Sequence, residues 1–147
     1  MGIINDVIVT PLKIIGAEGG SVYHVLKSHE SSYDKFGEAY FSTVDKNVIR
    51  PWKRHNRMTL NIAVIVGAIK FVMYDDRIGS ETEGIFHEIV LSPMVNYSRL
   101  TVPPGIWMAF KGVSDSGEGI LINIANLPHD PEEVDRLELK DLPYKWI

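Results

Sequence analysis

Glycine and proline divide the chain into many short apolar runs, and this division restricts the possible folds more than any other feature. Valine and isoleucine dominate several of the runs, and turn-forming residues separate them. The runs cover residues 7–9, 22–26, 39–44, 60–66, 69–74, 85–91, 98–102, 106–113 and 119–125. Short β-branched runs with this spacing are typical of a sandwich or barrel, so the sequence predicts an all-β fold.

The run from Thr59 to Val66 shows the clearest two-residue alternation. Large aliphatic side chains occupy its even positions, whereas Thr59, Asn61 and Ala63 are smaller or polar, until Ile65 interrupts the pattern. One face therefore suits a core, and the other could line a cavity, which makes Asn61 a candidate substrate-binding residue. Because Gly67 and Ala68 alone separate this run from the next, the pattern also predicts a hairpin over residues 60–74.

The C-terminal tail has a different character. Pro131 is followed by two glutamates and a valine, a pattern that predicts a short helical turn with acidic residues at its start. The whole chain, residues 1–147, is long enough to bury the core of one domain.

Composition excludes several classes of function. The chain has no cysteine, which excludes disulfides, a zinc ribbon, a cysteine-bound iron–sulfur cluster and a thiol nucleophile. A net charge of −4 provides no basic field for binding nucleic acid. No apolar run reaches the roughly 20 residues that span a bilayer, and the first residues lack the layout of a signal peptide. We therefore expect a cytoplasmic protein with no membrane partner.

The densest polar cluster lies between Arg50 and Arg57, where five of eight side chains are cationic or can become so. In an extended segment, Lys53 and His55 point to one side and Arg54 points to the other. The functional interpretation is an anion site, in which arginine binds phosphate and lysine or histidine transfers protons. The alternative is a solvated surface loop. Metal binding is disfavoured, because a protonated Lys53 is not a ligand.

Three uncharged side chains are further candidates. Trp107 follows a turn rich in proline and could stack on a base or sugar, or pack in the core, and Tyr40 carries the same ambiguity. Asn123 is a single amide in an apolar strand, so it is either hydrogen-bonded internally or faces a wet cavity. The histidines outside the cationic cluster have no visible partner and are interpreted as structural: His24, His29, His87 and His129.

From about Phe36 to the C-terminus the chain resembles the dTDP-4-dehydrorhamnose 3,5-epimerases and their relatives in the cupin superfamily. The resemblance rests on the order and spacing of several motifs. They are Phe36-x-Glu38-x-Tyr40-x-Ser42, Val48-Ile49-Arg50-Pro51-Trp52-Lys53, Asp75-Asp76-Arg77 with Ser80 to Gly84, Leu91-Ser92 with Asn96, Val102-Pro103-Pro104-Gly105 with Phe110, and Pro131-Glu132 with Asp141 to Trp146. It implies a cupin jelly-roll barrel of two antiparallel sheets with a short helical C-terminal segment. It also implies a homodimer, often with exchanged N-terminal strands, that uses no metal or redox cofactor.

The resemblance also implies site residues, and the chain departs from the family at most of them. The family's base, a histidine, falls on Lys53, and its acid, a tyrosine, falls on Asn123. Asp141 matches the aspartate that partners the base, and Arg50 matches the substrate-binding arginine. A family lysine falls on Leu60, and a second cavity histidine falls on Met108.

Two main hypotheses follow. The first is a nucleotide-sugar epimerase or keto-isomerase that removes the proton beside the ketone of a 4-keto-6-deoxy sugar, in the synthesis of cell-surface polysaccharide precursors. Its catalytic candidates are Lys53, His55, Asp141 and Asn123, and its substrate-binding candidates are Arg50, Arg54, Tyr40, Asn61 and Trp107. The second is a non-catalytic cupin that binds a nucleotide sugar or carbohydrate. A third interpretation is a β-domain that acts through a protein contact.

Overall fold

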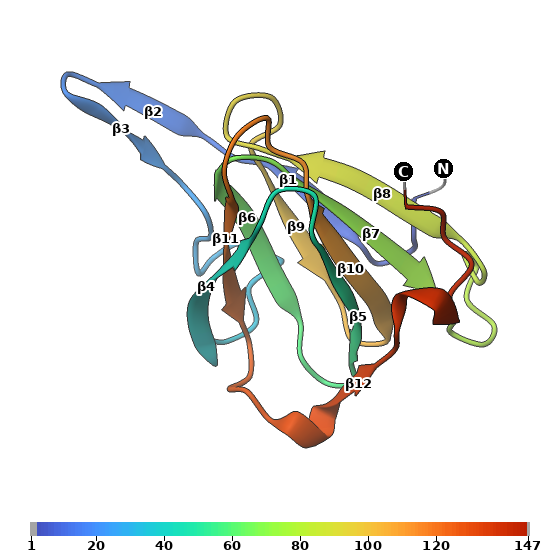
Figure 1. Ribbon diagram of the computed structural model, residues 1–147. Helices are drawn as coiled ribbons and strands as arrows, with labels where there is room; N and C mark the ends of the chain where they lie inside the picture. Colours follow the sequence, from blue (N-terminus) through green and yellow to red (C-terminus); the bar gives the residue numbers. More distant parts are fainter. Residues whose placement is uncertain (1–2, 147) are drawn as a thin grey trace.

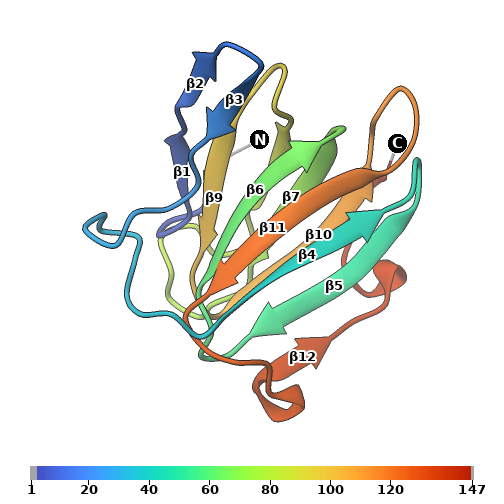
Figure 2. The same ribbon diagram turned by 90° about the vertical axis from the view of Figure 1, so that its left-hand side faces the viewer.

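The computed structural model describes residues 3–146 and contains two five-stranded sheets that face each other (Figures 1 and 2). The first sheet has the strand order β1 (Ile8–Pro11), β9 (Ser98–Val102), β6 (Leu60–Val66), β11 (Gly119–Ala125), β4 (Glu38–Val44). The second has the order β12 (Val134–Arg136), β5 (Ile49–His55), β10 (Ile106–Gly112), β7 (Ile69–Asp75), β8 (Phe86–Leu91). Neighbouring strands pair antiparallel, which confirms the predicted all-β jelly roll.

The main core lies between the two sheets, and strand alternation builds it. In β6 the side chains of Leu60, Ile62 and Val64 are buried there, and in β7 those of Phe71 and Met73 belong to the same cluster. Because successive side chains of a strand point to opposite faces, each strand contributes every second residue to this interior.

The predicted hairpin over residues 60–74 is wrong. Strand β6 belongs to the first sheet and β7 to the second, where β7 pairs with β10 and β8. The link at Gly67 crosses between the sheets, and Ala68 hydrogen-bonds to Ser114 Oγ and to the Val113 amide instead of closing a hairpin. This arrangement lets the apolar faces of both strands meet across the core. The interruption at Ile65 marks a β-bulge in β6.

A second apolar cluster lies on the outer face of the second sheet. Trp52, Val72, Trp107 and Ala109 are buried there beneath the C-terminal tail. The tail contributes the partly buried residues Leu137, Leu139, Leu142, Tyr144 and Trp146 to this cluster. It contains two short 3₁₀ helices, η1 (Pro131–Glu133) and η2 (Leu139–Asp141), of which η1 lies at the predicted helical turn. Among the described residues, no helix is both long and apolar enough to cross a membrane.

A separate hairpin extends away from the two sheets (Figure 1). It consists of β2 (Ile14–Ala17) and β3 (Gly20–Tyr23), and all eight residues of these two strands are exposed. The sequence predicted a strand near β3 but not β2. A two-stranded hairpin without a packed face is marginally stable alone, so this hairpin is a candidate contact surface.

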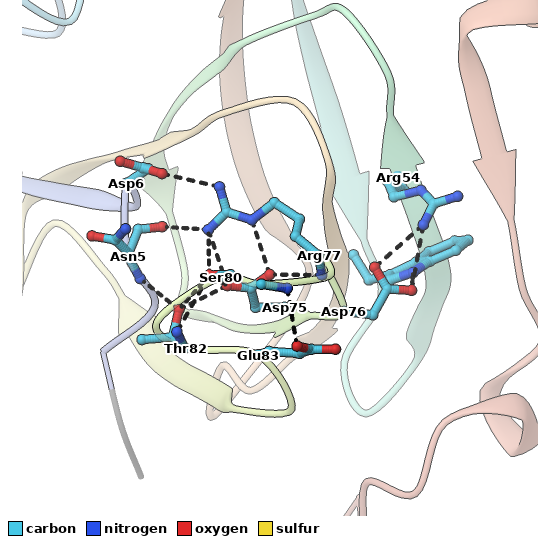
Figure 3. Close-up of polar contacts among 11 residues, drawn as sticks. Asn5, Asp6, Arg54, Asp75, Asp76, Arg77, Ser80, Thr82 and Glu83 are labelled. Atoms are coloured by element: carbon cyan, nitrogen blue, oxygen red, sulfur yellow. Dashed lines mark hydrogen bonds and ion pairs between the residues drawn. The ribbon is translucent and has the colours of Figure 1, made fainter.

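A buried carboxylate holds the N-terminal segment to the end of β7 (Figure 3). Asp75 is fully buried and accepts hydrogen bonds from the Arg77 guanidinium and from the hydroxyls of Ser80 and Thr82. Arg77 in turn bonds Asp6 and the carbonyl of Asn5. Burial raises the pKa of Asp75, but these hydrogen bonds outweigh burial and hold the pKa well below its usual range.

We predict that Asp75→Asn lowers the free energy of unfolding by about 3 kcal/mol at pH 7, because it removes one partner of a buried ion pair. The pKa of Asp75 is depressed on folding, so its contribution is complete above its unfolded pKa of about 3.9. The contribution is lost as pH falls toward the folded pKa, so the difference between wild type and variant shrinks in acid. Urea unfolding across pH measures both effects.

The matched control is Asp6→Asn, which removes the exposed partner of the same arginine. We expect it to cost about 0–1 kcal/mol, as exposed ion pairs do. Equal losses from the two variants would contradict the role assigned to Asp75.

Candidate active site

A cavity between the two sheets holds most of the polar side chains singled out above. The empty space in it, including the open mouth, is about 910 Å³. Its polar lining residues are Tyr40, Ser42, Arg50, Lys53, His55, Asn123, His129 and Arg136. The rest of the wall is mainly apolar and includes Leu60 and Met108, the positions where the resemblance places a lysine and a histidine in the family.

Strand β5 supplies the basic side of the cavity, and a β-bulge decides which of its residues face inward. Lys53 pairs with Met108 of β10, whereas Arg50 pairs with Phe110, so β5 carries one extra residue between these pairs. This bulge contains Pro51, a residue tolerated at bulges because it cannot donate a ladder hydrogen bond. It brings Arg50 to the cavity together with Lys53, although an odd separation in a regular strand would place them on opposite faces.

Three cationic side chains of the cavity, those of Arg50, Lys53 and Arg136, have no carboxylate partner within residues 3–146. Lys53 and Arg136 are cross-strand partners in β5 and β12. Loss of solvation, with the positive charges of Arg136 and Arg50, lowers the pKa of Lys53 below its ordinary value. Like charges gathered in this way favour an anionic ligand.

His55 hydrogen-bonds a buried glutamate that the sequence analysis did not single out. Its Nδ1 contacts Oε1 of Glu133, and the two side chains are 16% and 2% exposed. Since the carboxylate accepts, Nδ1 carries a proton, and in the neutral ring Nε2 carries a lone pair. Within the described part of the chain, no group hydrogen-bonds to this Nε2. His55 therefore has the arrangement of a general base oriented by a carboxylate.

Local backbone structure holds Glu133 in place. Asp130 caps η1 by accepting a hydrogen bond from the Glu132 amide at 3.0 Å. Oε2 of Glu133 accepts the backbone N–H groups of Asn56, Arg57 and Met58, at 3.1, 2.8 and 3.1 Å.

These contacts also keep Glu133 ionised. Burial raises its pKa, but the hydrogen bonds from His55 and from the Arg57 and Met58 amides outweigh burial, so the pKa lies below its ordinary value. A negative charge beside His55 in turn stabilises the imidazolium that forms when His55 takes a proton.

The first sheet supplies the other polar side of the cavity. Asn123 of β11 and Tyr40 of β4 are cross-strand partners, so their side chains lie on the same face. Nδ2 of Asn123 donates to Oη of Tyr40 at 3.0 Å, and Asn123 Oδ1 accepts the backbone N–H of Asn61 at 3.1 Å. The predicted cavity residues Tyr40, Asn123, Arg50, Lys53 and His55 are thus brought together.

Two of the predicted substrate-binding residues lie on the outer face of the second sheet. The Arg54 guanidinium lies 4.6 Å from the ring centroid of Trp107 and pairs with Asp76 and Asp135 (Figure 3 draws the Asp76 pair). The indole of Trp107 donates to Asp76 at 2.9 Å. Strand alternation explains both positions, because Arg54 lies between two inward-facing residues, as the sequence already indicated.

Asn61 and Asp141 are also outside the cavity lining. Asn61 is buried on the opposite face of β6, where its side chain bonds Ser32 O and Thr101 Oγ1. Asp141 is exposed in η2 and accepts the Glu138 amide at 2.8 Å. The expectation that Asp141 orients the base is therefore corrected: Glu133, eight positions earlier, contacts His55.

Sequence reasoning also missed His129 and Arg136, which line the cavity. The available signal was the acidic helical turn after Pro131. The two residues lie on either side of this turn, so a turn that packs at the cavity brings both of them close to it. Within residues 3–146, no group of three or more histidine, aspartate or glutamate side chains is arranged to hold a metal ion.

We predict that Glu133→Gln lowers the free energy of unfolding by about 2 kcal/mol at neutral pH, since it replaces a buried, charged acceptor. The pKa of Glu133 is depressed on folding, so this contribution is present above its unfolded pKa and is lost as pH falls through the folded one. Chemical denaturation between pH 3 and pH 7 tests both statements.

Glu132→Gln, at the exposed neighbour, is the control and should change stability by less than about 0.5 kcal/mol. In ¹⁵N spectra of neutral His55, wild type should show the proton on Nδ1, and Glu133→Gln should weaken that preference. An unchanged tautomer and an unchanged stability would refute the pairing.

No protein-family model and no curated protein matches the chain. Among solved structures, it is similar to a dTDP sugar isomerase from Desulfovibrio desulfuricans G20, with 34% identity over 97% of this chain and 92% of that chain and a TM-score of 0.92.

Two more distant structures show the same fold. A dTDP-6-deoxy-D-glucose-3,5-epimerase from Legionella pneumophila is 23% identical, with a TM-score of 0.83 over 94% of this chain and 76% of that chain. A dTDP-4-dehydrorhamnose 3,5-epimerase from Bacillus anthracis is 21% identical, with a TM-score of 0.77 over 96% and 85%. The first comparison, at 34% identity over nearly the full length of both chains, identifies the family: the chain belongs to the dTDP-4-dehydrorhamnose 3,5-epimerase-like cupins.

Proposed function

We propose that the protein is a nucleotide-sugar epimerase or keto-isomerase acting on a 4-keto-6-deoxy sugar linked to a nucleoside diphosphate such as dTDP. The observation that carries the proposal is the His55–Glu133 pair, which shares its cavity with three cations that have no carboxylate partner within residues 3–146. The similarity to a dTDP sugar isomerase supports the substrate class. Such a substrate favours action in the cytoplasm, in a route to precursors of cell-surface polysaccharides.

The cations account for the nucleotide part of the substrate. Arg50, Lys53 and Arg136 repel one another in the free protein, and a diphosphate would relieve that repulsion. Arginine also matches phosphate geometry through its fork of N–H groups. The apolar wall, with Met58, Leu60 and Ile62, suits the methyl group of a 6-deoxy sugar or a pyrimidine base.

His55 is the base of the proposed reaction. Its Nε2 takes the proton from the carbon beside the ketone, and the electron pair of that C–H bond moves to the keto oxygen to form an enolate. The imidazolium that results is stabilised by Glu133. Returning a proton to the same carbon, on the other face, gives the epimer. Returning it to the former carbonyl carbon, while the proton of the adjacent hydroxyl passes to the old keto oxygen through an enediol, gives the keto isomer.

Lys53 is the electrophile in this scheme. It lies two residues from His55 on the same face of β5, so both can approach the same part of the substrate. Its ammonium group donates a hydrogen bond to the developing enolate oxygen, and its lowered pKa makes it a better proton donor than an ordinary lysine.

We predict that His55→Asn slows exchange of the proton beside the ketone by at least about 100-fold, the lower end of the usual contribution of a general base. A dTDP-4-keto-6-deoxy sugar is incubated with the protein in heavy water, and carbon-bound deuterium is followed by NMR. The control is His29→Asn, an exposed position outside the cavity, which should exchange at the wild-type rate.

Absence of deuterium incorporation by wild type with every sugar nucleotide tested would reject the catalytic proposal. If such a ligand binds tightly and is recovered unchanged, the chain is a binding protein instead. Wild-type exchange by His55→Asn would reject His55 as the base.

We also propose that a second copy of the chain covers the outer face of the first sheet. Phe41 is 67% exposed there, beside its cross-strand partner Ile122 and the partly buried Ile120 and Ile124. The exposed hairpin β2–β3 adds further apolar side chains. Exposed apolar side chains of this kind are typical of a protein interface, and a homodimer fits the resemblance stated above.

Light scattering coupled to gel filtration should therefore give twice the chain mass of 16.6 kDa. Phe41→Lys should shift the protein to the monomer mass, because it places a charge on the apolar face. Ile78→Lys, at a loop residue that is 97% exposed, should leave the dimer intact. A monomeric wild type would refute this interface.

A further inference from the structure

Epimerisation, one of the two proposed outcomes, needs a second proton donor. A base on one side of the substrate removes a proton and can return it to the same side, which exchanges the proton but leaves the configuration unchanged. Inversion requires an acid on the opposite side of the enolate. Asn123 lacks an acidic proton, and Lys53 lies on the same strand and the same face as His55.

Tyr40 is the acidic side chain that the first sheet brings to the cavity. His55 and Lys53 come from β5 of the second sheet, whereas Tyr40 comes from β4 of the first. Both residues line the same cavity, so a substrate there would be approached by Tyr40 from the first sheet and by His55 from the second. Tyr40 is therefore the candidate for an acid that acts from a different sheet than the base.

The hydrogen bonds around Asn123 determine whether the Tyr40 hydroxyl donates or accepts a hydrogen bond there. Since Oδ1 of Asn123 accepts the Asn61 backbone N–H, the amide must present Nδ2 to Tyr40. Asn123 is 1% exposed and held between two strands, which prevents the amide from reversing. The Tyr40 oxygen therefore accepts from Asn123, and its own O–H proton is free to be donated into the cavity.

We propose that Tyr40 is the catalytic acid of this protein and that Asn123 is the residue that positions it. The Tyr40 O–H bond breaks as a C–H bond forms at the enolate carbon, on the side opposite His55. The phenolate that remains is stabilised by the Nδ2–H of Asn123 and regains its proton from water, while the His55 imidazolium loses its proton to water. The inference rests on the proposed function.

Tyr40→Phe separates exchange from product formation. With a dTDP-4-keto-6-deoxy sugar in heavy water, we expect this variant to retain carbon-bound deuterium exchange within about fivefold of wild type. Formation of the epimer should fall by at least about 100-fold. The control Tyr74→Phe removes a hydroxyl on the outer face of the second sheet and should leave both rates unchanged.

Asn123→Asp tests the positioning role with a side chain of nearly the same shape. The new carboxylate still accepts the Asn61 N–H, but it also accepts the Tyr40 proton and so withdraws that proton from the substrate. We expect the same pattern as for Tyr40→Phe, namely retained exchange and lost product. Thermal unfolding should show that both variants remain folded at the assay temperature.

The outcomes distinguish the two proposals. If wild type shows no exchange, the proposed function itself fails. If wild type exchanges and Tyr40→Phe forms product at the wild-type rate, the inference fails and the proposed function stands. If folded Tyr40→Phe loses exchange and product equally, Tyr40 acts in binding, and its assignment as the acid is overturned.

Discussion

The carboxylate of Glu133 is the interaction on which the rest of the site depends. One oxygen contacts His55, and the other accepts three consecutive backbone N–H groups at the end of β5. A buried charge is tolerated only when it is paired and hydrogen-bonded, and these contacts satisfy both conditions. The same carboxylate therefore attaches the C-terminal tail to β5 and fixes the ring of the proposed base.

The two sheets divide the chemistry of the cavity between them. The second sheet provides His55 and the cations, and the first provides Tyr40 and Asn123. The chain carries Lys53 and Asn123 where related epimerases are expected to carry a histidine and a tyrosine. In the structure, an imidazole and a phenol still line the cavity. The imidazole belongs to His55, two positions after Lys53 on β5, and the phenol belongs to Tyr40 on β4, which pairs with the strand that carries Asn123. His55 therefore lies on the same face of its sheet as Lys53, and Tyr40 on the same face as Asn123. Side chains two residues apart in a strand share a face, and so do cross-strand partners.

Predictions of which side chains share one face of a strand agreed with the structure, whereas the prediction of which strands pair did not. The common side of Lys53 and His55 and the turn after Pro131 follow from neighbouring residues. The hairpin over residues 60–74 was wrong because burial of both apolar faces places β6 and β7 in different sheets. Trp107 and Arg54 have suitable chemistry for binding a nucleotide, but strand alternation places them on the outer face.

By itself, the sequence determined the all-β class, the resemblance to a family and the cationic segment from Arg50 to Arg57, since composition, spacing and alternation are local properties. Only the tertiary structure decided that Glu133 and not Asp141 contacts His55, that a bulge turns Arg50 inward, and that Asn123 orients Tyr40. These contacts join segments far apart in the chain, and their geometry depends on sheet register and bulges. A local break in alternation, as at Ile65, can mark a bulge, but the register of distant strands follows only from their pairing.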